Sequence, residues 1–99
     1  MKLNSTFLAM QISQKPLTRY GLMAEKHWRE FLPAMVAELE AKGELQEALY
    51  EAQERTKDEQ EELYQHFLKK GLTAQQADSQ AWEMVRERYL LLPPEQPAS

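Results

Sequence analysis

Residues 44–70 read ELQEALYEAQERTKDEQEELYQHFLKK and contain neither glycine nor proline. Gly43 precedes this stretch and Gly71 follows it. Because glycine readily adopts the left-handed backbone that ends a helix, the spacing predicts one long helix between two chain reversals. We therefore expect an all-α protein.

The predicted long helix is apolar near its ends and polar in the middle. Leu45, Leu49, Leu63 and Phe67 recur at helical spacing, whereas residues 53–62 are almost wholly polar. A helix of this composition does not lie deep inside a large core. We interpret the polar block as a solvated helix face rather than an acidic recognition surface.

A wide apolar stripe lies before Gly43. It follows Thr18, a suitable N-cap, and consists of Tyr20, Met23, Ala24, Trp28, Phe31, Leu32, Met35, Val36 and Leu39. Pro33 lies inside the stripe, where its ring clashes with the preceding turn. The helix either kinks at residues 29–33 or breaks, with a new helix starting at Pro33. We favour a kink, because the stripe keeps its phase across the proline.

The third predicted helix starts just after Gly71. Thr73 and Gln76 have the spacing of a capping box, and helical periodicity continues to about Leu90. The predicted fold is a small three-helix up-down-up bundle whose first helix is kinked at Pro33.

The two ends of the chain differ from the bundle. Residues 1–17 carry an alternating apolar patch and are interpreted as a short extended arm, with a single helical turn as the alternative. Residues 93–99 read PPEQPAS and are expected to be an extended or disordered proline-rich tail. The bundle domain is thus assigned to residues 18–92.

Composition narrows the class of protein. The chain has 99 residues, 42% of them hydrophobic and 28% charged, as expected for one folded domain. It contains no cysteine, which excludes disulfides and cysteine-based zinc sites. The apolar patch near the N-terminus is too short for a signal peptide or a membrane span, so we expect a cytoplasmic protein without membrane association.

Charge is unevenly distributed along the chain. Residues 1–29 carry five Lys or Arg and one acid, whereas residues 30–62 carry three Lys or Arg and eleven acids. Antiparallel packing of the first helix on the second would place Lys26 and Arg29 near acids of the long helix. Exposed pairs of this kind are worth roughly 0.2 to 1 kcal/mol each, enough to bias the register of packing.

No set of residues has the spacing of a catalytic or metal site. The two histidines, His27 and His66, are preceded at three positions by Ala24 and Leu63, not by the glutamates typical of bundle metal sites. The glycines stand alone and form no phosphate-binding loop. We therefore predict that the protein is not an enzyme and has no metal, cofactor or small-molecule substrate.

Interaction is the function that the pattern favours. We predict a small adaptor or regulatory protein that binds a protein partner or a second copy through Trp28, Phe31, Met35 and Trp82. The alternative is a nucleic-acid accessory protein using a basic face of Lys15, Arg19, Lys26 and Arg29. Net charge of −4 disfavours the alternative.

One family resemblance follows from the order of several motifs. These are Tyr20-Gly21, Trp28, Leu39, Gly43-Glu44-Leu45, Gly71-Leu72-Thr73 and Trp82. The order resembles that of small helical bacterial proteins of the transposon-encoded TnpV type, over about residues 19–90. The chain departs from that type in having a less basic first helix and in Pro33. The resemblance implies a non-enzymatic accessory protein of undefined role and assigns no functional residues.

Overall fold

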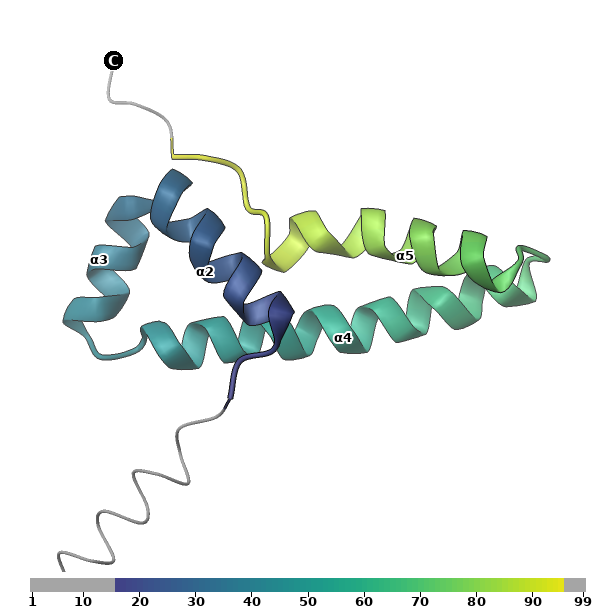
Figure 1. Ribbon diagram of the computed structural model, residues 1–99, viewed down its shortest axis with the longest axis horizontal. Coiled ribbons are helices and arrows are strands. Elements are labelled where there is room, and N and C mark those ends of the chain that lie inside the picture. Colours follow the sequence, from purple (N-terminus) through teal and green to yellow (C-terminus); the bar gives the residue numbers. More distant parts are fainter. Residues whose placement is uncertain (1–15, 96–99) are drawn as a thin grey trace, which may run out of the picture.

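The protein is described by a computed structural model in which residues 16–95 are placed (Figure 1). Within that range the chain forms four helices and no strand: α2 (Arg19–Phe31), α3 (Pro33–Ala41), α4 (Leu45–Lys69) and α5 (Ala74–Tyr89). The predicted all-α class is confirmed for these residues. Nearly all of the predicted N-terminal arm, residues 1–15, lies outside the described residues.

The predicted long helix is confirmed as α4, shorter by one residue at each end. Both flanking glycines have positive φ, 69° at Gly43 and 100° at Gly71. At the second reversal the backbone N–H of Leu72 donates to the carbonyl of Phe67 at 3.1 Å. Gly43 therefore ends α3 and Gly71 ends α4, each by the left-handed cap that the local sequence predicts.

The fourth helix, α5, begins as predicted. The Thr73 hydroxyl accepts from the backbone N–H of Gln76, and the Gln76 side chain accepts from the backbone N–H of Thr73, each at 3.1 Å. Helices α4 and α5 then run antiparallel as a hairpin (Figure 1). Ala77, Ala81 and Val85 of α5 are fully buried, and their small side chains let the two backbones approach closely.

The predicted kink at Pro33 is wrong, because the chain breaks there into two helices. Leu32 has φ −133° and ψ 50°, outside the helical region, and Pro33 is the first residue of α3. Proline has no N–H to donate to the carbonyl four residues earlier, and it disfavours helical dihedrals at the preceding residue. The described chain thus has four helices, and the three-helix up-down-up arrangement is not confirmed.

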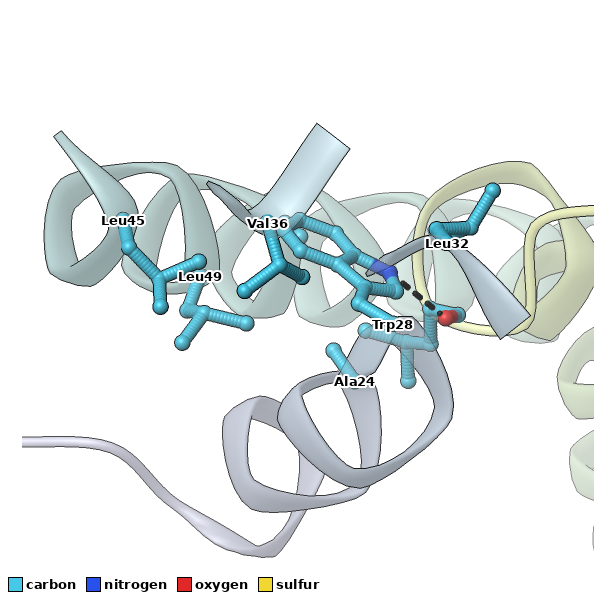
Figure 2. Close-up of a cluster of buried hydrophobic side chains, with 8 residues drawn as sticks. Ala24, Trp28, Leu32, Val36, Leu45 and Leu49 are labelled. Atoms are coloured by element: carbon cyan, nitrogen blue, oxygen red, sulfur yellow. Dashed lines mark hydrogen bonds between the residues drawn. The ribbon is translucent and has the colours of Figure 1, made fainter. Parts of the chain in front are cut away.

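The hydrophobic core lies at one end of the hairpin, where α2 and α3 pack on the first half of α4 (Figure 1). Figure 2 shows Trp28 among the aliphatic side chains of this cluster. Its buried members are Ala24, Trp28, Leu32, Val36, Leu45, Leu49, Ala52 and Leu90. The far half of α4 packs along α5, so that part of the hairpin extends away from the core.

Two residues of the polar block are not solvated, contrary to prediction. Gln53 is 1% exposed and Thr56 is 0% exposed. The Gln53 Oε1 atom accepts from the backbone N–H of Thr18 at 2.6 Å, and its Nε2 donates to the carbonyl of Pro16 at 3.1 Å. Gln53 therefore fixes the start of α2 on α4.

Candidate functional site

The segment after α5 returns to the junction of α2 and α3 (Figure 1). We call residues 90–95 the strap and residues 31–35 the elbow. The strap begins with Leu90, which is fully buried and whose carbonyl accepts from Trp28 Nε1 at 2.9 Å (Figure 2). Further along, His27 Nε2 donates to the carbonyl of Leu92 at 2.7 Å. Two side chains of α2 thus hold the main chain of the strap.

The strap ends at the elbow with Glu95, which caps α3. Its carboxylate oxygens accept from the backbone N–H groups of Ala34 at 3.1 Å and Met35 at 2.9 Å. Its own N–H donates to the carbonyl of Phe31 at 2.9 Å. The first residues of a helix have free N–H groups and a partial positive charge, so a carboxylate there is favourable.

The cap is needed because the local sequence supplies none. Leu32, at the N-cap position of α3, makes no side-chain hydrogen bond to the helix. Pro33 at the first helical position has no N–H. Glu95 therefore provides from the other end of the described chain what a serine or aspartate at position 32 provides in most helices.

Two of the four residues predicted to form an interaction surface, Phe31 and Met35, lie in the elbow, and a third, Trp28, lies behind it in the core. Trp28 is buried, at 5% exposed, and belongs to the core. Phe31 is 39% exposed, and its ring lies 4.7 Å from that of His27, centroid to centroid. Met35 is half-buried and packs against the core. Of the three, Phe31 and Met35 are the ones with surface left for a partner.

The fourth predicted residue, Trp82, lies elsewhere. It stacks on Tyr20 with ring centroids 5.2 Å apart and an interplanar angle of 14°. Tyr20 lies in the first turn of α2, at the end opposite the elbow, and its hydroxyl donates to Gln60 Oε1 at 2.7 Å. Trp82 thus joins α2 to the hairpin.

Helix α3 presents an apolar surface next to the elbow. Val36 is its one buried residue, and Met35 and Leu39 are half-buried. Its two charged residues, Glu38 and Glu40, form ion pairs with Lys42 and Arg29 respectively. The rest of its surface consists of the exposed residues Pro33, Ala34, Ala37 and Ala41.

The predicted basic face is only partly brought together. Arg19 and Lys26 are exposed on α2, and Lys15 lies outside the described residues. Arg29 forms ion pairs with Glu25 at 2.9 Å and Glu40 at 3.2 Å. Both partners belong to α2 and α3, whereas an acid of the long helix had been expected. Arg29 is therefore compensated and offers little free charge to a phosphate.

A polar cluster of Glu59, Arg88 and Tyr89 joins α4 to the end of α5. Glu59 accepts hydrogen bonds from the hydroxyl of Tyr89 and from Arg88, the latter at 2.7 Å. Both bonds favour the ionised carboxylate, so the pKa of Glu59 is lowered, chiefly by Tyr89 and then by Arg88. The same contact raises the pKa of Tyr89.

A groove of about 320 Å³ lies between this cluster and Trp28. Its apolar lining includes Ala48, Ala52 and Leu92, and its two arginines are Arg55 and Arg88. Each arginine is paired with a glutamate of α4, so the charges at the groove are balanced.

Neither a metal cluster nor a membrane span is found in residues 16–95. No three His, Cys, Asp or Glu side chains of this range are grouped so that they could hold a metal ion. None of the four described helices is both long and apolar enough to cross a bilayer.

The sequence does not reveal the roles of two residues that hold the strap in place, His27 and Glu95. From the sequence, His27 is a candidate for a metal or catalytic group and a neighbour of the basic face, and Glu95 belongs to the proline-rich tail. The signal that points to Glu95 is a helix start at Leu32-Pro33 without a capping side chain, which requires a partner from elsewhere. Sequence spacing does not show which acid fills that position.

Comparison with known proteins returned no match among family models, curated proteins or solved structures. The resemblance to the TnpV type therefore stays a prediction.

Proposed function

We propose that the protein is a small, non-enzymatic interaction module, of the adaptor or regulatory kind, that binds a protein partner or a second copy through α3 and Phe31. The supporting observation is the apolar surface of α3, of whose residues only Val36 is buried by the described part of the chain, residues 16–95. A helix that is apolar on nearly all sides is usually covered by other parts of a protein. Phe31 extends the same surface at the elbow with a ring that is 39% exposed.

The electrostatics of this surface favour a partner. Glu38 and Glu40 already have cationic partners, so covering α3 leaves few charges without compensation. Aromatic and methionine side chains such as Phe31 and Met35 are enriched at protein interfaces.

Self-association is tested by light scattering and sedimentation over a dilution series. We expect mass to rise with concentration in the natural chain and to stay monomeric in Ala37→Lys, which places a charge in the centre of the α3 surface. Ala74→Lys is the matched control, because Ala74 is also exposed but lies at the far end of the hairpin. A monomer at every concentration would remove the second copy as the partner.

A heterologous partner is tested by affinity purification with the same variants. We expect a partner retained by the natural chain and by Ala74→Lys to be lost with Ala37→Lys. Partners retained equally by all three proteins would place the interface away from α3.

The alternative, a nucleic-acid accessory protein, depends on Arg19 and Lys26, because Arg29 is paired with two glutamates. Its test is DNA binding with a steep dependence on salt that is lost when Arg19 and Lys26 are reversed in charge.

A further inference from the structure

We propose that the elbow is a recognition site for an extended peptide bearing a glutamate or aspartate, and that the strap occupies this site in cis. The inference rests on the proposed function and deepens it, because it names the chemical class of partner. The strap is the ligand already in place, and its contacts define what the site recognises.

The elbow binds main-chain groups and one carboxylate. Phe31 accepts from the backbone N–H of Glu95, and the carboxylate of Glu95 accepts from Ala34 and Met35. His27 donates to the carbonyl of the residue three positions earlier, Leu92. Main-chain contacts of this kind suit any extended peptide, and the carboxylate selects those with an acid at one position.

The end of the strap is less buried than its beginning. Leu90 is fully buried in the core, whereas Pro93 and Pro94 are exposed and Glu95 is half-buried. Residues 93–95 can therefore leave the elbow while Leu90 stays in the core. Because proline has little backbone freedom to lose, a proline-containing peptide is ordered at the elbow at low entropic cost.

Competition from the strap sets the requirements for a partner. A short tethered segment has an effective concentration on the order of millimolar. A free peptide at lower concentration displaces the strap only if it makes additional contacts. The exposed residues Ala34 and Ala37 continue directly from the carboxylate position along α3, so a longer partner segment finds those contacts on the surface assigned above.

The test uses the full-length chain carrying Glu95→Ala, which empties the carboxylate position. The probe is the acetylated and amidated peptide LLPPE, which repeats residues 91–95, and the matched control peptide is LLPPQ. We expect saturable NMR shifts of the Ala34 and Met35 amides with LLPPE, and binding about tenfold weaker with LLPPQ, since a carboxylate accepts hydrogen bonds more strongly than an amide. In the natural chain the same peptide should bind more weakly than in Glu95→Ala, because the strap competes.

Two results would overturn the inference: the absence of saturable shifts at Ala34 and Met35, or equal binding of both peptides. If Glu95→Ala loses α3, as seen by the loss of its amide signals, Glu95→Gln replaces it, because the amide oxygen keeps α3 capped while lowering competition by the strap. Ala37→Lys combined with Glu95→Ala separates the two proposals. Loss of self-association with peptide binding retained supports both, whereas loss of self-association together with loss of peptide binding removes only this inference. Self-association retained in this variant would place the interface away from α3.

Discussion

The carboxylate of Glu95 lies 2.9 Å from the backbone nitrogen of Met35, a residue 60 positions earlier in the chain. This contact supplies a cap to α3, whose own N-cap residue, Leu32, has none to offer. It also joins the strap to the elbow and so fixes where α3 begins. The orientation of the apolar α3 surface depends on this long-range contact.

Glu95→Ala should lower the free energy of unfolding by about 1 kcal/mol, the usual cost of losing an N-terminal cap. The amides of Ala34 and Met35 should exchange with solvent faster, because they lose their acceptors. Hydrogen exchange measured by NMR checks this. Glu83→Ala, at an exposed glutamate of α5, is the control, and an equal effect of both substitutions would contradict the assigned cap.

Trp28→Phe should destabilise the protein by about 1–3 kcal/mol, because the carbonyl of Leu90 loses its indole donor inside the core. The measurement is the urea midpoint followed by circular dichroism. Trp82→Phe makes the same chemical change at a half-buried position where a ring can still stack on Tyr20. We expect a smaller loss of stability for Trp82→Phe. Similar losses of stability for the two variants would show that the hydrogen bond of the Trp28 indole contributes little.

Gly21→Ala should destabilise the protein although alanine favours helices by about 1 kcal/mol over glycine. An added Cβ would lie 2.6 Å from Gln53 Oε1 and 2.8 Å from Leu17 Cδ2. Gln53 is buried and holds Thr18, so its displacement breaks hydrogen bonds, and we expect a net loss of about 1–3 kcal/mol. Thermal denaturation measures this loss. In the Gln53→Ala background the loss should shrink, and full additivity would contradict the clash.

Gly71→Val should lower the free energy of unfolding by about 1 kcal/mol or more, because Gly71 has φ 100° and valine avoids that backbone region. No neighbouring atom lies within 4 Å of a Cβ added there, so the effect is one of backbone conformation. The melting temperature reports it. Gly71→Asn should cost less, since asparagine tolerates positive φ. An unchanged melting temperature in Gly71→Val would rule out a strained cap.

Glu59→Gln should change how stability depends on pH. The folded state lowers the pKa of Glu59, so its stabilising contribution is complete above the ordinary glutamate pKa of about 4.3 and is lost as pH falls through the lowered value. The natural chain should therefore melt above Glu59→Gln at pH 7, and the difference should vanish in acid. Because the pKa of Tyr89 is raised, the stabilising contribution of its hydroxyl is present below about pH 10 and is lost in stronger base. Glu62→Gln, at an exposed glutamate, is the control substitution, and the same pH dependence in both variants would contradict the role assigned to Glu59.

The polar block shows where sequence reasoning about the fold failed. Helical spacing places Gln53 and Thr56 on the side of α4 that carries Leu49, yet their polarity favoured solvent. In the structure both are buried, because Gln53 bonds to Thr18 and Pro16, and the Thr56 hydroxyl donates to the carbonyl of Ala52 at 2.8 Å. A polar side chain is buried when partners satisfy it. Thr56 finds its partner within α4, whereas the partners of Gln53 lie in the segment just before α2.

The positions at which the helices start and stop followed from neighbouring residues. Gly43 follows the end of α3 and Gly71 follows the end of α4, both with positive φ, Thr18 caps α2, and Thr73 with Gln76 caps α5. Each of these capping interactions joins residues within about four positions of one another, so the local sequence is enough to predict it. For the same reason Pro33 predicted a disturbance at the right place.

Packing of distant segments settled the rest. Which acid caps α3 and whether Trp28 is available to a partner both depend on the strap lying against α2 and α3. A contact between residues 60 positions apart produces no spacing or periodicity in the sequence from which it could be predicted. It forms only once α4 and α5 have folded back as a hairpin. The apolar surface proposed for binding is what this packing leaves uncovered.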